Sequence, residues 1–556
     1  MKAEIQNINH GQSNNYFEWL KAHWLFLSIA LIVLAKNWLL EVVPFVARDG
    51  FRHDDSLFIR LAASIVDGKW LGEFDQYILI KGPIYPLWIA FNYYLGLDII
   101  HTQDLLFLFA CLVILKAISA DVKNQAALLL IFVFLYLNPV SFDYLSISHA
   151  FRMVIYTSLT LLCFGALLGL FLRLYSQDRK YIYWSVLFGI SISLFWYTRE
   201  EGEWLLPGIA LIAGSFIFFQ IYKRQWRQFR SAIIGFIIVP VMLWGGTTGI
   251  LGYMNWKNYG MFYVIEVMTP NFTRAYNALL KIEPQEFRRY YPVRTTTIEK
   301  LFELSPKIKE LSTFEGLDDF TGAQFIWAFR KAVDHAGYYS QGAQYADQYY
   351  SDLADELEAL CENERVVCNE QLLSYVTVWR PEYTNEFGSS FIKLFKRVIR
   401  FKDFSMSQDG FYSTGGTTYL NSVQKLTHAR IQLYEKQVFY PDSKFFEPLS
   451  EFKTNVLSVL GKSQLWIRPA LFYLAVILLV VAGIRDLMHK RYNPYTIYSM
   501  AVLGSIVTLV VGITIIDLTA YRSLFRPLHG VLPLPPLFII TVVLAWSVDR
   551  SLYEKE

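Results

Sequence analysis

The long apolar runs of this chain constrain its fold more than any other feature. A run of about 20 apolar residues is long enough to cross a bilayer as a helix. About ten such runs recur, at residues 23–43, 103–119, 125–138, 152–172, 183–198, 205–221, 232–253, 467–484, 496–516 and 530–548. With 54% hydrophobic and 18% charged residues, the chain is too apolar for a soluble globular protein. We predict an α-class, polytopic membrane helical bundle of about 10 transmembrane helices.

The charged residues concentrate between the seventh and eighth runs. Residues 255–465 have ordinary polarity, so we predict a mostly helical, water-exposed domain at this point. The chain then divides into an N-terminal transmembrane module (1–254), this domain (255–465) and C-terminal transmembrane helices (466–556). A net charge of +3 is close to neutral for 556 residues and gives no argument for nucleic acid as a partner.

The cysteines divide into two kinds. Cys361 and Cys368 flank the sequence ENERVV in the polar domain, where a disulfide would fit an oxidising compartment. Two unpaired thiols fit the spacing equally well. Cys111 and Cys163 stand alone in apolar runs and are interpreted as small buried hydrophobic residues.

Basic residues in the loops orient the bundle. Three loops carry them: Arg173, Arg179 and Lys180; Lys223, Arg224, Arg227 and Arg230; Arg485, Lys490 and Arg491. The positive-inside rule places these loops and both termini in the cytoplasm and the polar domain outside. The first run lacks a small-residue cleavage site and is predicted to be an anchor. We expect a bacterial inner (plasma) membrane protein, although an endoplasmic-reticulum protein would show the same charges.

The first outer loop, residues 44–102, contains a further apolar stretch at 82–97. Counting it as a span would place the later basic loops on the wrong side, so we predict a helix lying in the membrane interface. The polar clusters at 48–55, 81–83, 138–152, 198–204 and 521–527 then all face outward. We therefore predict an extracytoplasmic site, roofed by the polar domain.

An acidic pair stands in this first outer loop. His53, Asp54 and Asp55 directly precede a predicted helix. One aspartate at this place is explained by helix capping. Two adjacent aspartates cannot both cap in the same way, so their side chains should diverge and leave one free as a general base or a cation ligand. Asp54 and Asp55 are the catalytic candidates.

Two motifs follow the acidic pair. One is A-x-x-I-x-x-G-x-W, beginning at Ala62, and the other is K-G-P-x-x-P-L, beginning at Lys81. Together with the acidic pair they resemble the start of GT-C superfamily glycosyltransferases, which include protein O-mannosyltransferases and aminoarabinose transferases. The resemblance covers roughly residues 20–210. It implies a polyprenyl-phosphate sugar donor, an extracytoplasmic site and inverting transfer, with Asp54 or Asp55 as the base.

The sequence also departs from this family. Asp-Asp replaces the usual Asp-Glu, the loop has no D-x-D, and the W-W-D-Y-G motif of oligosaccharyltransferases is absent. Transfer of a whole oligosaccharide to asparagine is therefore not expected. No cofactor is implied with certainty, and a divalent cation, Mg²⁺ or Mn²⁺, remains open.

A lipid phosphate needs cationic partners, and several stand at the outer ends of the runs. In the segment TREEGEW, Arg199 would bind the donor phosphate through bidentate hydrogen bonds. By the resemblance, Glu200 or Glu201 would orient the acceptor, whereas mutual ion pairing is the alternative. The other substrate-binding candidates are His53, Lys81, His149, Arg152, Arg522 and Arg526. Snorkelling to headgroups is the alternative for the arginines.

Three further features are interpreted structurally. The basic amphipathic stretch 391–402 is predicted to lie on anionic membrane lipid rather than to bind a polyanionic acceptor. The glycine-rich loop 409–421 is placed to cover the site. Lys36 and Glu41, near the outer end of the first run, are expected to pair or snorkel.

These features favour a membrane glycosyltransferase that moves a sugar from a polyprenyl-phosphate-linked donor to a glycan, lipid or protein acceptor. One alternative is a transporter or flippase of lipid-linked glycans, which should carry ionisable groups or broken helices at mid-membrane. Another alternative, a glycan polymerase or ligase, is chemically close and not separable by sequence.

Overall fold

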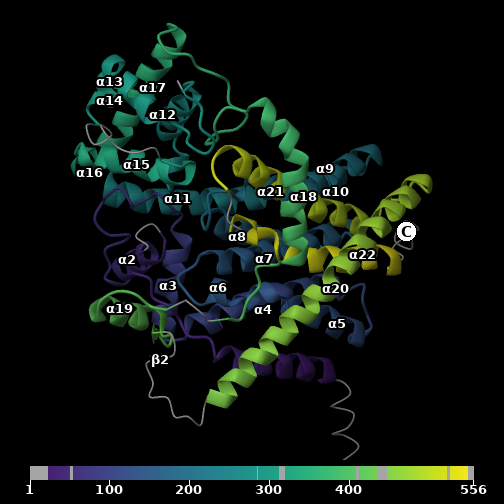
Figure 1. The fold of residues 1–556 in the computed structure, drawn as a ribbon. Helices are drawn as coiled ribbons and strands as arrows, with labels where there is room; N and C mark the ends of the chain where they lie inside the picture. The colour runs from purple at the N-terminus through teal and green to yellow at the C-terminus, as the bar shows by residue number, and fades with distance from the viewer. Residues whose placement is uncertain are drawn as a thin grey trace, which may run out of the picture.

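The computed structural model describes residues 23–50, 54–284, 286–311, 320–407, 412–434, 437–438, 447–522 and 526–548. This part of the chain is almost wholly helical, apart from one small antiparallel pair of strands, β1 (Gln432–Tyr434) and β2 (Gln437–Val438). Long helices form a bundle, and a group of shorter helices from the inserted segment lies at one end of it (Figure 1). The chain is thus a polytopic α-helical membrane protein, as the apolar runs predicted.

Each predicted run corresponds to a helix. Their bounds are His23–Leu40, α4 (Ile99–Ile118), α5 (Gln125–Tyr136), α7 (Met153–Tyr175), α8 (Tyr181–Trp196), α9 (Leu206–Tyr222), α10 (Trp226–Ile233) continuing into α11 (Val239–Tyr259), α20 (Glu447–Met488), α21 (Pro494–Thr519) and α22 (Leu534–Ser547). Within the described ranges, eight helices pass as candidate spans by length and hydropathy, and a ninth results if α5 and the following bent segment Pro139–Ile147 form one span. About ten were predicted. The difference includes α8, whose 16 residues rise only about 24 Å, short of a 30 Å hydrocarbon core.

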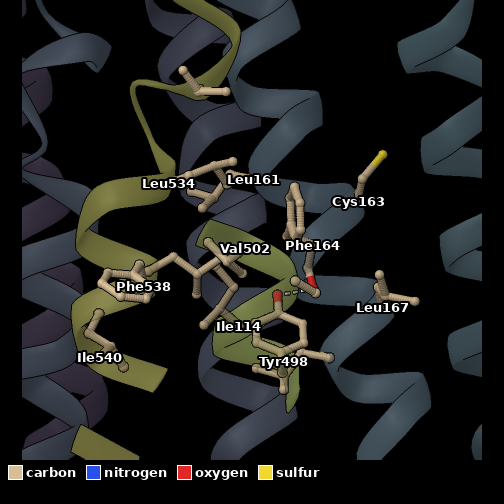
Figure 2. Packing of buried hydrophobic residues seen from close by; sticks show 14 of the residues in the cluster. Ile114, Leu161, Cys163, Phe164, Leu167, Tyr498, Val502, Leu534, Phe538 and Ile540 are labelled. Carbon is tan, nitrogen blue, oxygen red and sulfur yellow. Dashed lines mark hydrogen bonds between the residues drawn. The ribbon is translucent and has the colours of Figure 1, made fainter. Parts of the chain in front are cut away.

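Helix α7 forms the centre of the bundle, because its apolar 18-residue stretch is completely buried inside the protein. Figure 2 shows Phe164 of this helix beside Tyr498 and Val502 of α21, and the Tyr498 hydroxyl donates to the Phe164 carbonyl at 2.7 Å. A Cβ atom added to Gly165 would lie 2.8 Å from Ile114 of α4. Small residues let membrane helices approach closely, so this glycine lets α4 pack directly on α7.

The first outer loop contains two helices, α2 (Asp55–Val66) and α3 (Ile84–Leu95). With 12 residues, α3 rises about 18 Å and is too short to cross the bilayer. This length agrees with the prediction that the stretch is not a span. Short helical turns connect the long helices at the same end of the bundle, namely η1 (Pro139–Ser141), α6 (Tyr144–Ile147), η2 (Gly202–Leu205) and η6 (Arg526–Val531).

The inserted segment has a hydrophobic core of its own, built between residues 272 and 366. It comprises η4 (Glu266–Met268), α12 (Pro270–Lys281), α13 (Thr295–Leu304), α14 (Pro306–Lys309), α15 (Gly322–His335), α16 (Tyr338–Gln341) and α17 (Ala343–Glu362). Cys361 and Cys368 form a disulfide at the end of α17, so the bridged alternative predicted for this pair is found and the unpaired one is not. Cys111 and Cys163 are free and buried. The limits 255–465 of the domain remain a prediction.

The amphipathic helix α18 (Pro381–Arg400) corrects the prediction that this stretch lies on lipid. It runs along the bundle beside α20 and α21 (Figure 1). Phe395 packs against Phe472 of α20 with ring centroids 6.0 Å apart, and Arg468 Nε donates to the Ile399 carbonyl at 2.8 Å. The apolar face is therefore covered by the protein's own helices. Amphipathic periodicity indicates an apolar partner without saying whether that partner is lipid or protein.

Candidate functional site

The acidic pair diverges as predicted. Asp54 precedes α2, makes no side-chain capping bond, and accepts a short hydrogen bond from the Lys81 ammonium. Asp55, the first residue of α2, lies 2.5 Å from Nδ1 of His149. The Asp54 side chain is 51% exposed, whereas that of Asp55 is 3% exposed. Only Asp54 therefore presents a carboxylate that an incoming molecule can reach.

His149 fixes Asp55 from the other side of the pair. Its Nε2 lies 3.0 Å from the Leu145 carbonyl, which only a protonated nitrogen can bond. Nδ1 makes a short contact with Asp55, and the ring and the carboxylate are both buried. Phe151 stacks on the ring at 5.0 Å between centroids. Asp55 is thus held inside the protein, while Asp54 faces outward.

A second ion pair joins the K-G-P motif to the turn after α8. Arg152 Nη1 donates to Glu200 Oε1 at 2.7 Å, and the Gly82 amide donates to the same oxygen at 3.2 Å. A Cβ on Gly82 would lie 1.9 Å from the Tyr197 carbonyl oxygen, so only glycine allows this approach. The glycine of the motif therefore brings Lys81 and Arg152 to the same place.

Aromatic rings line the cations. Lys81 Nζ lies 5.1 Å from the Phe58 ring centroid and 5.6 Å from that of Trp327, and Arg152 lies 5.9 Å from Phe58. Trp327 comes from α15 of the inserted segment, so this segment contributes to the site. Sequence reasoning did not find Trp327, because a tryptophan on an amphipathic helix carries no local sign of its distant partner.

The electrostatics of the cluster favour an ionised Asp54. Burial works against ionisation, but the charges of Lys81, Arg152 and Arg526 outweigh it and lower the pKa of Asp54 to about 2. Burial lowers the pKa of Lys81, although Asp54 opposes that change. Asp54 is therefore a carboxylate surrounded by positive charge at neutral pH.

The predicted pairing alternative for TREEGEW is found in the structure. Arg199 Nη2 donates to Glu201 Oε1 at 2.8 Å. Burial of Glu201 would raise its pKa, but Arg199 outweighs burial and lowers the pKa to about 2. Arg199 also touches the Met153 sulfur, next to Arg152 in the chain. Arg199 and Glu201 therefore lie beside the cluster as an ion pair, with the Glu201 side chain 46% exposed.

The remaining candidates lie at different distances from this cluster. Arg526 is exposed, lies 5.4 Å from the Phe151 ring centroid, and acts electrostatically on Asp54. Arg522 is exposed, and no contact places it in the cluster. His53 lies outside the described residues. Where the structure describes the side chains, no group of three or more His, Cys, Asp or Glu residues is arranged to hold a metal ion.

The end of the inserted segment lies against the first outer loop. Phe45 pairs with Ile431, Val46 with His149, and Arg48 with Thr414 in isolated β-bridges. The Thr414 amide donates to the Ala47 carbonyl at 2.8 Å, and the Ser413 hydroxyl accepts from the Ala47 amide at 2.9 Å. The described part of the glycine-rich loop therefore packs beside the strand that leads to Asp54 and Asp55.

Comparison with known proteins gives few matches. No family model matches the chain, and no curated protein matches it. Two similar solved structures are those of ArnT from Cupriavidus metallidurans. The form bound to undecaprenyl phosphate is 12% identical over 89% of this chain and 77% of that chain, with a TM-score of 0.32. The apo form is 11% identical over 90% and 78%, with a TM-score of 0.29.

The sequence identities and TM-scores to these two structures are both low. Likeness at such low TM-scores carries no argument about activity, so the proposals below rest on the chain's own residues. The fold and the cluster define a polytopic helical membrane protein in which two carboxylates, Asp54 and Glu200, and several cations meet at one end of the helical bundle.

Proposed function

We propose that this protein is a membrane glycosyltransferase that moves a sugar from a polyprenyl-phosphate-linked donor to an extracytoplasmic acceptor, with inversion. One observation carries the proposal: the half-exposed carboxylate of Asp54 stands among Lys81, Arg152 and Arg526. A carboxylate can take a proton from an acceptor hydroxyl, and cations can stabilise a phosphate leaving group. The cluster brings both functions together.

The proposed reaction has a simple balance of bonds. Asp54 accepts the proton of an acceptor hydroxyl. The oxygen of that hydroxyl attacks the anomeric carbon of the donor sugar from the side opposite the phosphate. The bond between that carbon and the phosphate oxygen breaks, and the polyprenyl phosphate leaves with the electron pair. Lys81 and Arg152 stabilise the negative charge that develops on it. Attack opposite the leaving group inverts the anomeric centre.

The low pKa of Asp54 fits a base that is activated by the donor. A carboxylate with a pKa of about 2 is a weak base at neutral pH. An arriving lipid phosphate would compete for Lys81 and Arg152 and add negative charge nearby, and both effects raise a carboxylate pKa. Asp54 would then gain basicity only when the donor is bound. Asp55, buried against His149, is proposed to position the start of α2.

The orientation of the protein is part of the proposal. The basic loops favour cytoplasmic termini and an outward-facing site in the inner membrane. The Cys361–Cys368 disulfide supports this orientation, since disulfides persist in oxidising compartments. The acceptor is a glycan, a lipid or a protein on that side.

The first experiment measures transfer of radiolabelled sugar from polyprenyl-phosphate donors in membranes with matched amounts of wild type, Asp54→Asn and Asp55→Asn. We expect Asp54→Asn to lose at least about 100-fold in rate, and Asp55→Asn to lose less activity per folded molecule. If wild type transfers nothing from any donor, or if Asp54→Asn matches wild type, the catalytic assignment is wrong and the transporter alternative moves ahead.

The same assay addresses divalent cations. Lys81 and Arg152 already supply positive charge beside Asp54, so we expect transfer to continue after treatment with EDTA. Loss of transfer that Mg²⁺ or Mn²⁺ restores would show that a cation completes the site.

A further inference from the structure

A cavity of about 400 Å³ lies beside α2, where α19 (Thr417–Thr427) packs against that helix (Figure 1). This volume is within the range of small-molecule sites in proteins, roughly 300–1,000 Å³. The lining side chains with polar groups are Asp49, Ser56, Arg60, Tyr77, Tyr419 and Ser422. They come from both the first outer loop and the inserted segment. The proposed reaction does not use any of them.

The charges on the cavity wall argue against a phosphate ligand. Among the described lining residues, Arg60 is the only cation, and its guanidinium is bidentate to Asp75, at 2.6 and 3.3 Å. Asp49 adds a carboxylate. A phosphate would meet one paired cation and the additional carboxylate of Asp49. At the Asp54 site, by contrast, three cations, Lys81, Arg152 and Arg526, face two carboxylates, Asp54 and Glu200.

The polar lining also argues against a lipid chain. Most of the lining surface is apolar, but six of the nine described lining residues carry polar groups, and a hydrocarbon would bury these groups without hydrogen bonds, which is costly. The buried Tyr419 hydroxyl has no hydrogen-bond partner in the part of the chain that the structure describes. Burial raises the pKa of Tyr419, so this hydroxyl stays neutral and can both donate and accept. Unsatisfied buried hydroxyls call for a polar ligand or water.

The cavity is connected to the reacting end of α2 by aromatic rings. Tyr77 lies on the cavity lining, and its ring centroid is 6.5 Å from that of Trp327. Trp327 is in turn 5.6 Å from Lys81 Nζ, which bonds Asp54. A ligand in the cavity would therefore lie next to the reaction centre without occupying it.

We propose that this cavity is a carbohydrate subsite that binds one ring of a glycan acceptor, while a hydroxyl of an adjoining sugar unit reaches Asp54. Sugar rings combine hydroxyls, which suit Asp49, Ser56 and Ser422, with an apolar face that suits tyrosine rings. The acceptor is then a glycan of at least two units, rather than a protein side chain or a simple lipid. This assignment rests on the proposed transferase function.

The test is equilibrium binding by ligand-observed NMR, with the full chain in lipid nanodiscs. The probes are trisaccharides of glucose, mannose and N-acetylglucosamine in α and β linkages, with the monosaccharides and inorganic phosphate for comparison. Ser422→Trp fills the cavity, and Asn421→Trp places the same bulk on the neighbouring exposed position of α19. Tyr419→Phe removes only the unpartnered hydroxyl.

We expect a trisaccharide to bind wild type and Asn421→Trp alike, to lose binding with Ser422→Trp, and to bind Tyr419→Phe about 3- to 10-fold more weakly. The inference is overturned if no trisaccharide binds, if Ser422→Trp binds as well as wild type, or if phosphate alone occupies the cavity.

Consumption of the donor by wild type, with water as the acceptor, is measured in parallel. If the donor is consumed but no glycan binds, the proposed subsite is wrong and the proposed transferase function stands. If a glycan binds but no donor is consumed, the proposed transferase function is wrong and the cavity is a carbohydrate-binding site.

Discussion

Two Lys–Asp pairs in this protein have the same chemistry and opposite surroundings. In the bundle, Lys36 Nζ lies 2.6 Å from Asp104 Oδ1, and both side chains are 2% exposed. The Lys36 ammonium also donates to the Tyr136 carbonyl at 3.0 Å and to the Ser141 hydroxyl at 2.7 Å, which uses all three of its protons. At the outer site, by contrast, Lys81 is buried and Asp54 is half exposed.

The difference separates a structural pair from the pair that we propose to react. The Lys36 pair is enclosed within the protein and leaves no atom exposed to a substrate. It also lies near the end of its helix, two residues before Trp38, rather than at mid-membrane as a transport path would require. The Asp54 pair leaves a carboxylate facing outward. Exposure, and not residue type, therefore distinguishes the two.

The largest effect is expected from breaking the buried pair of Lys36 and Asp104. Lys36→Met leaves the Asp104 carboxylate buried without its partner, which typically costs about 3–5 kcal/mol. We expect a large drop in the midpoint of thermal unfolding of purified protein in detergent. The double variant Lys36→Met, Asp104→Leu removes both charges and should recover most of that loss. A single variant as stable as wild type would contradict the structural role.

A smaller effect sharpens the comparison between the two aspartates. Asp55→Asn disturbs a buried hydrogen bond to His149 and should destabilise the protein by about 1–3 kcal/mol. Asp54→Asn replaces a half-exposed carboxylate and should cost less than about 1 kcal/mol. Denaturant unfolding curves of the two variants measure this order. Equal losses would mean that exposure does not separate their roles.

The smallest effect is a dependence on pH. The folded-state pKa of Asp54 is about 2, below its ordinary value of 3.8, because Lys81 and its neighbouring cations outweigh burial. The stability that Asp54 contributes is therefore present above about pH 4 and lost as the pH falls toward 2. The gap in unfolding midpoint between wild type and Asp54→Asn should close between about pH 5 and pH 2. A gap that stays constant over this range would argue against the ion pair.

Much of the fold and part of the site could be predicted from local sequence. The apolar runs predicted the positions of the helices because their hydrophobicity is continuous. The divergence of Asp54 and Asp55 was predictable because two adjacent aspartates cannot both cap a helix in the same way. The partners were not predictable. His149 is 94 residues from Asp55, and the pairing of Glu200 with Arg152 depends on Gly82 packing against the Tyr197 carbonyl. Such pairings follow from tertiary packing and leave no pattern in local sequence.

The ends of some helices could also not be predicted from local sequence. The eighth run was predicted over 467–484, yet α20 extends over Glu447–Met488. Hydropathy marks the apolar part of a helix, whereas its polar extension is indistinguishable from a surface segment until its neighbours are known. The basic helix α18 was misplaced on lipid for a related reason, since a helix face records only that its partner is apolar.

The bridges between residues 45–48 and the end of the inserted segment bear on how the protein is made. The Ala47 amide donates its hydrogen bond to the Ser413 hydroxyl, and Ser413 leaves the ribosome 366 residues later. Until then, the strand leading to Asp54 lacks part of the backbone pairing that holds it. The loop bearing the aspartates is therefore synthesised early and acquires its final shape late, so a nascent chain that ends before Ser413 would lack this backbone pairing.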